Sequence, residues 1–387
     1  MTSSDELLVV GGGIGGLSAA LSVAHTGRPV RVLERATEFG EIGAGLQLAP
    51  NATRVLDRLG LLERVIDAGV LPDRLVFGDA LTGHELTRLE FEDFPRRYGA
   101  PYVVLHRSDL LDILVDACRE RGVALETGKH VVEIENTTDH VVAHCQDGSR
   151  YRGGAAVGAD GLRSGTRKML SDDEPTQSGF VAYRGAIPVQ DATRPAELTE
   201  VVIWIGPGLH FVQYPLRRGE IYNQVAVFRS PGYAAGRDDW GEPDELDEAF
   251  SVTCEHVREA KRSLWRDQHW SMHDREPLDN WLTGRTVLLG DAAHPMLQYL
   301  AQGACQAIED AEVLARCLEQ HDSPQWDKAL RAYQEERIPR TAEIQRVARV
   351  WGDIWHVDGL AAMLRNEVFT QRRHDDHRHI EWLYGGT

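Results

Sequence analysis

Three glycines and one glutamate near the start of the chain have the spacing of a dinucleotide-binding turn. Gly11, Gly13 and Gly16 fit the pattern G-x-G-x-x-G, in which missing Cβ atoms let the backbone turn sharply and approach a pyrophosphate. Glu34 follows 18 residues after Gly16 (34 − 16), close to the offset of an acid that accepts hydrogen bonds from a ribose diol. Because an acid at this place repels a 2′-phosphate, the pattern predicts FAD or NAD rather than NADP.

The elements that must position this turn can be predicted on both sides of it. Residues 7–10 form an unbroken apolar run, which is typical of a strand buried on both faces. Apolar residues at helical spacing follow over 17–24, and residues 30–33 begin a second strand. The motif has a strand before it, a helix after it and an acid at the right distance. These three features distinguish it from a glycine turn that arises by chance.

Two further turns combine a glycine with an acid after a short apolar strand. They are Asp160-Gly161 and Gly290-Asp291. A helix starting near Pro295 would turn its positive N-terminal end toward the same place as the second acid. Since no second G-x-G-x-x-G and no CxxC are visible, we expect a nicotinamide cofactor to bind only transiently.

The remaining chain predicts alternating strands and helices. Residues 36–50 are rich in Gly and predict an irregular loop, after which Asn51 can cap a helix over 52–62. Ser108 is the predicted N-cap of a helix that runs to residue 119. Further strands are predicted over 73–90, 131–135, 141–145, 149–152, 201–205, 209–214, 222–228 and 286–289, and helices over 243–264, 303–320 and 326–350.

Composition excludes several classes of function. The chain has 387 residues, with 60 acids against 42 bases and a net charge of −18, which argues against a nucleic acid or an anionic membrane as partner. Five scattered cysteines suggest neither a disulfide framework nor a zinc site, and no metal site is predicted. No stretch approaches the ~20 apolar residues of a spanning helix, so we expect a cytoplasmic protein without integral membrane association.

The ordered set of GxGxxG, DG and GD motifs resembles the single-component flavoprotein aromatic hydroxylases, also called group A FAD monooxygenases. The resemblance extends from Leu8 to about Leu383. It implies tightly but non-covalently bound FAD, with NADH as a transient co-substrate. By the same resemblance, Asp291 holds the ribityl chain, Arg107 lies along the pyrophosphate, and Asp160 with Arg163 supports the nicotinamide approach. The expected cofactor-binding residues are Gly11, Gly13, Ile14, Gly16, Glu34, Arg35, Gln47, Arg107, Asp160, Asp291, Gly303 and Ala304.

The resemblance and the predicted elements together indicate an α/β fold. We expect a Rossmann-like FAD-binding domain with an inserted β-rich substrate domain and a C-terminal helical segment. The expected FAD-binding parts are 1–72, 101–177 and 276–350, the substrate-domain parts are 73–100 and 178–275, and the tail is 351–387.

Within the family, five stretches are most similar to the 3-hydroxybenzoate 6-hydroxylases. They are residues 39–51, 98–110, 210–220, 290–304 and 351–359. This similarity implies hydroxylation of a monohydroxybenzoate by a flavin C4a-hydroperoxide, with 3-hydroxybenzoate giving gentisate because an ionised phenol activates its para carbon. A decarboxylating salicylate hydroxylase, a tailoring monooxygenase acting on a larger aromatic compound and a non-catalytic flavin-containing redox sensor remain open.

Four residues are the expected catalytic groups. His210 is the predicted base beside the phenol, since imidazole titrates in the right range and the family pattern places a histidine there. Gln298, Tyr102 and Tyr214 are expected to contact substrate oxygens. His294 is expected to be structural. Arg184 is expected to meet either the substrate carboxylate or the flavin, and the apolar lining is predicted to include Val212, Phe228, Met296, Leu297 and Leu300.

The aromatic tail over 351–369 predicts a helix-loop-helix that either covers the pocket, forms a subunit contact or packs onto its own domain. We expect the partners to be a small aromatic acid, O2 and a second copy of the chain in a homodimer.

Overall fold

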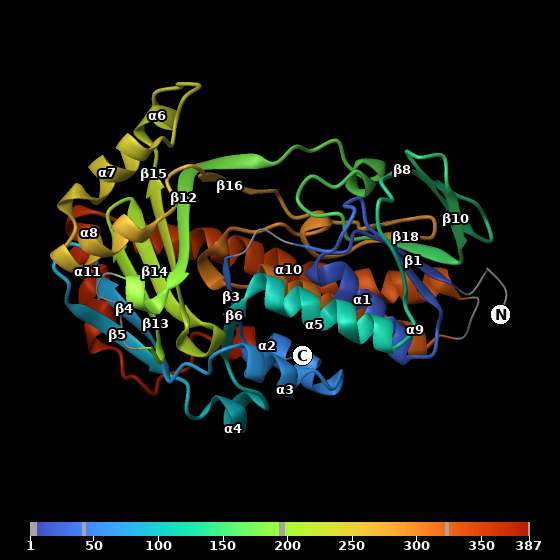
Figure 1. Cartoon of the computed structure of the whole chain (residues 1–387), viewed down its shortest axis with the longest axis horizontal. Helices are drawn as coiled ribbons and strands as arrows, with labels where there is room; N and C mark the ends of the chain where they lie inside the picture. The colour runs from blue at the N-terminus through green and yellow to red at the C-terminus, as the bar shows by residue number, and fades with distance from the viewer. Residues whose placement is uncertain (1–5, 41–43, 193–197, 322–324, 386–387) are drawn as a thin grey trace.

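Two large sheets lie at opposite ends of an elongated molecule (Figure 1). The computed structural model describes residues 6–40, 44–192, 198–321 and 325–385. One sheet has six strands in the order β17 (Leu282–Thr283), β18 (Thr286–Leu288), β11 (Ala155–Gly158), β1 (Leu7–Val10), β2 (Val30–Leu33) and β7 (Ala124–Glu126). The other has seven strands in the order β16 (Trp270–Asp274), β12 (Thr176–Pro188), β15 (Ile221–Arg229), β14 (Leu209–Leu216), β13 (Glu200–Gly206), β4 (Arg74–Asp79) and β5 (Glu85–Glu90).

The six-stranded sheet contains the predicted strand-turn-helix-strand unit. β1 pairs in parallel with β2 and β11, and α1 (Ile14–His25) follows the glycine turn, which confirms the prediction for this stretch. Gly11 has φ 105°, and a Cβ atom there would meet the carbonyl of Ala159. A Cβ on Gly16 would meet the carbonyl of Gly11, so both positions require glycine.

The seven-stranded sheet joins two segments that are distant in sequence. β4 pairs in parallel with β13, so residues 74–90 extend the sheet formed by residues 176–274. One face of this sheet packs against α7 (Pro243–Ala249) and α8 (Glu255–Ala260), and the other faces the middle of the molecule. The helix predicted over 243–264 is interrupted, because α7 and α8 are separate helices. The division of the chain into domains stays a prediction.

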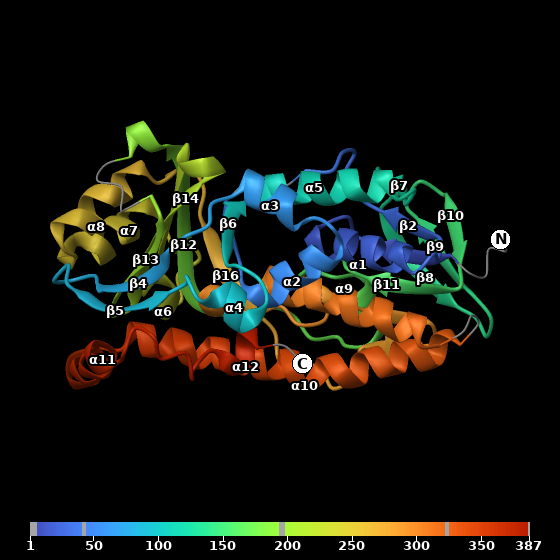
Figure 2. The same cartoon turned by 90° about the horizontal axis from the view of Figure 1, so that it is seen from below.

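The C-terminal helices run along one edge of the molecule, beneath both sheets (Figure 2). α10 (Trp326–His356) continues six residues beyond the predicted end at 350, so the first part of the expected tail belongs to this helix. α9 (Gly303–Glu319) packs on α1 and α10. α11 (Gly359–Gln371) and α12 (Glu381–Tyr384) complete the chain.

Smaller elements complete the described chain. The predicted meander consists of β8 (Val131–Asn136), β9 (Val141–Cys145) and β10 (Arg150–Gly153). The others are β3 (Gly45–Leu48), α2 (Pro50–Arg58), α3 (Leu62–Ala68), α4 (Phe94–Tyr98), β6 (Val103–His106), α5 (Arg107–Glu120) and α6 (Pro231–Ala234).

Three local predictions were wrong. The expected loop over 36–50 contains β3 and the start of α2, while residues 41–43 lie outside the described residues. Asn51 does not cap a helix but lies inside α2, where its side-chain amide donates to Gln302 Oε1 at 2.9 Å. His106 rather than Ser108 is the N-cap of α5, because its Nδ1 accepts from the Ser108 backbone N–H.

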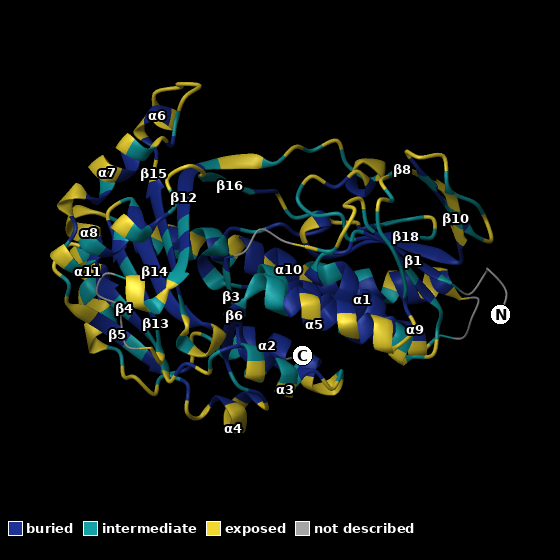
Figure 3. Ribbon diagram, in the orientation of Figure 1, coloured by how far each residue is buried: buried dark blue, intermediate teal, exposed yellow. Residues whose placement is uncertain are grey.

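Buried residues concentrate in the strands of both sheets and in α1 and α9 (Figure 3). The exposed residues gather on α7, α8 and the outer turns (Figure 3). Among the described residues, no helix combines the length and apolar character needed to cross a lipid bilayer.

Candidate active site

A cavity of about 1540 Å³ lies between the two sheets and is lined by residues from both. It collects nearly all of the residues that sequence reasoning singled out. They are Gly11, Gly13, Ile14, Glu34, Arg35, Gln47, Tyr102, Arg107, Asp160, Arg163, Arg184, His210, Tyr214, Asp291, Gln298, Gly303 and Ala304. Gly16 does not line the cavity but packs beneath it against Gly11.

Two helix N-termini open toward this cavity at its cofactor end. α1 begins after Gly13 and α9 begins at Gly303, and neither has a side-chain cap for its first N–H groups. Uncapped helix N-termini bind anions because their N–H groups and the helix dipole favour negative charge. Glu34 receives hydrogen bonds from the backbone N–H groups of Gly12 (2.6 Å) and Ala36 (2.8 Å), which fix its carboxylate beside the turn.

The two acid-containing turns differ in how their carboxylates are used. Asp160 accepts from the Ser164 hydroxyl and from the Thr166 backbone N–H (3.0 Å), so the chain itself occupies it. Asp291 makes no side-chain hydrogen bond to the described chain and is exposed at the cavity wall. Arg167 joins the two turns, since its Nη1 donates to the carbonyl of Ala293 at 2.8 Å.

A buried group of charges holds the Gly290-Asp291 turn from behind. Asp310 Oδ2 accepts from the backbone N–H of Gly290 (2.9 Å) and from His294 Nε2 (2.6 Å). Arg337 Nε donates to the other oxygen of Asp310 at 2.6 Å. Burial alone would raise the pKa of Asp310, but His294 and Arg337 lower it to about 2. His294 is therefore a structural residue, as predicted.

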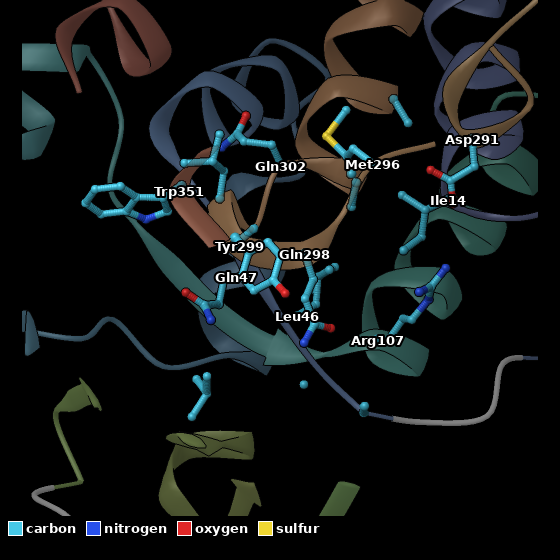
Figure 4. Close-up of a pocket in the computed structure, with 18 of the residues that line it drawn as sticks. Ile14, Leu46, Gln47, Arg107, Asp291, Met296, Gln298, Tyr299, Gln302 and Trp351 are labelled. Carbon is cyan, nitrogen blue, oxygen red and sulfur yellow. The ribbon is translucent and has the colours of Figure 1, made fainter. Parts of the chain in front are cut away.

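The helix expected near Pro295 is absent at that position. The chain forms a short 3-10 turn over Gln298–Leu300, Ala301 takes a left-handed conformation with φ 52°, and α9 starts only at Gly303. Gln298 and Tyr299 lie between Asp291 on one side of the view and Trp351 on the other (Figure 4). The positive helix end predicted for this motif therefore exists, but it comes eight residues later (303 − 295).

The substrate end of the cavity is one face of the seven-stranded sheet. Register places five cavity-lining side chains in one cross-strand row, ordered Phe77, Ile203, Val212, Val225 and Arg184. Four are apolar and the fifth is a cation. Burial lowers the pKa of Arg184, and its Nε makes no hydrogen bond to the described chain. An anion in the cavity would satisfy this guanidinium.

His210 lies two residues before Val212 in the strand, on the same face of β14 as Val212 and Tyr214. The side chain is 1% exposed, and burial lowers its pKa well below the ordinary value. Its Nδ1 lies 2.8 Å from Nε2 of His356, which leaves Nε2 of His210 as the ring nitrogen available to a ligand.

The other expected catalytic groups are held by short contacts. The Tyr102 hydroxyl donates to Gln47 Oε1 at 2.7 Å. Tyr214 packs against Gly45, where a Cβ atom would meet its ring. Burial raises the pKa of both tyrosines, so both phenols stay protonated, and that of Tyr102 already donates to Gln47.

Two predicted lining residues do not reach the cavity, and several unpredicted ones do. Phe228 packs on the opposite face of the sheet with Phe211, and Leu297 packs in the main core. The end of α10 contributes Trp351 and Trp355 to the wall. Gly352 allows α10 to approach Tyr299 closely, because a Cβ atom at this position would meet the Tyr299 ring. This glycine is the sequence signal that could have predicted the contact.

The residues present fit FAD. The glycine turn lies against the cavity, two uncapped helix N-termini face the same cavity, and Asp291 offers an unengaged carboxylate for hydroxyl groups. Residues 5–348 match the FAD binding domain family.

Comparison with known proteins agrees with this geometry. The chain is 42% identical to 3-hydroxybenzoate 6-hydroxylase 1 of Aquipseudomonas alcaligenes, over 98% of both chains. It is 38% identical to 3-hydroxybenzoate 6-hydroxylase of Polaromonas naphthalenivorans (strain CJ2), covering 98% of this chain and 95% of the relative. The crystal structure of Klebsiella pneumoniae HpxO complexed with FAD and uric acid superposes with a TM-score of 0.86 at 25% identity, covering 98% of this chain and 95% of that one. The chain therefore belongs to the FAD-binding family of flavoprotein aromatic monooxygenases.

Proposed function

We propose that this protein hydroxylates a monohydroxybenzoate, and that its substrate is 3-hydroxybenzoate, converted to gentisate with NADH and O2. The observation that carries the proposal is the substrate end of the cavity, where His210 and Arg184 lie on an otherwise apolar sheet face. An aromatic acid offers a flat apolar ring, a carboxylate and a hydroxyl group to this set of side chains. The relatives named above support the same substrate class.

The cofactor would be held by the glycine turn, Glu34, Arg107, Asp291 and the start of α9. When bound, FAD supplies the chemistry that reduces O2 with electrons from NADH and makes one oxygen atom electrophilic. The chain must do the rest, which is to orient the ring, ionise its phenol and exclude water.

His210 is the proposed base. Because burial keeps its imidazole neutral, Nε2 can accept the phenol proton, and the resulting phenolate is more electron-rich at the para carbon. Arg184, Tyr102, Tyr214 and Gln298 are the proposed partners of the carboxylate and of the substrate oxygens. The apolar row excludes water that would divert the activated oxygen to H2O2.

The test is a panel of aromatic acids given to the FAD-loaded protein, with NADH oxidation and product mass measured for each. We expect 3-hydroxybenzoate to stimulate NADH oxidation and to gain one oxygen atom without losing CO2. Salicylate converted to catechol with release of CO2 would favour the alternative activity. If no hydroxybenzoate stimulates NADH oxidation, the proposal is wrong. The homodimer stays a prediction, which light scattering of the purified protein would test.

A further inference from the structure

His210 is paired with a second buried histidine from a distant part of the chain. His356 is the last residue of α10, and its Nε2 lies 2.8 Å from Nδ1 of His210. The two rings are near-parallel, with an interplanar angle of 20°. The contact joins the inner sheet strand β14 to the end of a helix that also lines the cavity.

The position of His356 is fixed on several sides. Its ring stacks on Phe180 with centroids 4.6 Å apart, and the Arg229 guanidinium lies over the Phe180 ring, 5.0 Å from its centroid. The backbone carbonyl of His356 accepts from the N–H of Gly208 at 3.1 Å. These contacts hold Nε2 of His356 toward His210.

The charges near the pair are cations. Burial, Arg229 and Arg365 together lower the pKa of His356 to about 3. From the other elements packed on His210 come Tyr299, 5.5 Å away between ring centroids, and Trp355, 5.1 Å away. With both rings neutral, one nitrogen of the 2.8 Å contact must carry the hydrogen, and a hydrogen on Nδ1 of His210 leaves the lone pair of its Nε2 facing the cavity.

We propose that His356 is a positioning residue that accepts the hydrogen bond from Nδ1–H of His210, so that Nε2 of His210 carries its lone pair toward the substrate hydroxyl. This inference rests on the proposed function for its consequence, but not for its geometry. In the opposite arrangement, Nε2 of His210 would carry a hydrogen and could not accept one.

The proton moves from the substrate phenol to His210. The phenol O–H bond breaks, an N–H bond forms at Nε2 of His210, and the imidazolium keeps its Nδ1–H donated to His356. A carboxylate partner would stabilise the imidazolium strongly and favour a protonated histidine before substrate binds. A neutral imidazole fixes the tautomer without that effect, so His210 stays unprotonated until the phenol arrives.

Three variants separate this role from a packing role. H356F keeps a ring for stacking on Phe180 but removes the acceptor, whereas H356Q retains a side-chain oxygen that can accept. H377F is the matched control, since the His377 side chain is also buried among aromatic rings but makes no hydrogen bond to the described chain and does not line the cavity. Urea unfolding of each variant reports its folding.

The first readout is the tautomer of His210, observed by 15N NMR of the histidine side chains in the FAD-loaded protein without substrate. We expect hydrogen on Nδ1 and none on Nε2 in the wild type, H356Q and H377F. H356F should lose this preference. A wild type with hydrogen on Nε2 of His210 would overturn the proposal, whatever substrate the enzyme uses.

The second readout is the ionisation of bound 3-hydroxybenzoate, followed by ultraviolet difference spectra between pH 5 and 9, together with hydroxylated product formed per NADH. We expect H356F to lower product per NADH by about tenfold, and H356Q to restore most of it. In an H210A background, H356F should cause no further loss, because the two residues act as one unit.

Equal phenol titration and coupling in H356F and wild type would contradict the proposal. So would losses in H356F and H210A that multiply in the double variant. If the wild type hydroxylates no hydroxybenzoate while the tautomer behaves as expected, the proposed substrate is wrong and the positioning role stands.

Discussion

The two ends of the cavity differ in whether their buried charged groups have charged partners. At the cofactor end, buried charges meet charged partners, as Asp310 does with His294 and Arg337. At the substrate end, Arg184 and His210 lie among apolar side chains, and Arg184 Nε makes no hydrogen bond to the described chain. A satisfied group holds its shape without a ligand, whereas an unsatisfied one discriminates among ligands. We therefore expect the first end to set stability and FAD affinity, and the second to set selectivity and coupling.

The largest effect should come from breaking the buried charges. R337M leaves Asp310 buried without its guanidinium partner, while Glu309 keeps Arg340, so we expect a loss of about 3–5 kcal/mol in the free energy of unfolding and a fall in bound FAD. R316M removes the exposed ion pair with Glu336 between the same two helices and should cost less than about 1 kcal/mol. Urea unfolding and the FAD content of the purified protein provide the measurements. Similar losses in both variants would erase the contrast between buried and exposed pairs.

A change at the substrate end should spare the cofactor. H210A should keep FAD bound but lower hydroxylated product per NADH by about 100-fold or more, with H2O2 formed instead. Product by mass and H2O2 by a peroxidase assay measure this coupling. Unchanged coupling in H210A would remove His210 from its proposed role.

The two acid turns offer a test within the cofactor end. D291N should weaken FAD binding by about 1.5–3 kcal/mol while leaving unfolding of the apoprotein unchanged, because the Asp291 carboxylate makes no hydrogen bond or ion pair to the described chain. D160N should instead destabilise the apoprotein, since Asp160 holds Ser164 and Thr166. Titration of the apoprotein with FAD by flavin fluorescence, beside urea unfolding, separates the two effects. The reverse pattern would exchange the roles of these acids.

The last comparison concerns the pH dependence of stability. Both buried histidines have a folded-state pKa below the usual 6.5, so the unfolded chain binds protons first as the pH falls. The two histidines contribute fully to the free energy of unfolding above about pH 6.5. As the pH falls toward 3, each fully titrating site loses about 1.4 kcal/mol of this contribution per pH unit. Asp310, with a pKa of about 2 against 3.8, loses its contribution only below about pH 3.8.

The substrate end should therefore be the first to lose stability in acid. H356F removes one of the two titrating groups, so its unfolding free energy should fall less steeply between pH 6.5 and 4.5 than that of the wild type. Urea unfolding across this range measures both slopes. An identical slope would mean that His356 is not held neutral in the folded protein.

The cofactor end could be predicted from sequence because each of its roles is local. Gly11, Gly16 and Glu34 act within one strand-turn-helix-strand unit, and their spacing alone places them together. Tertiary contacts caused the errors nearby: Asn51 has the type of an N-cap, but Gln302 of a distant turn binds its amide inside the helix.

The substrate end depends on strand register and on one distant helix. Arg184 shares a row with Val212 only because β15 pairs between β12 and β14. His356 meets His210 across 146 residues of sequence, which no local pattern encodes. Alternation along β15 does show which side chains share a face, but it does not show which face borders the cavity, so Phe228 was assigned to the wrong side.

Helix α10 links these two ends as one continuous helix. It carries Arg337 at the buried charges and His356 at the histidine pair, 19 residues later (356 − 337), over a helix of 31 residues. Each residue advances about 1.5 Å and turns about 100°. Insertion or deletion of one residue between these positions would swing His356 away from β14 while leaving Arg337 in place. The number of residues between Arg337 and His356 is therefore fixed. Substitutions that preserve the helix are tolerated in this segment, whereas insertions and deletions are not.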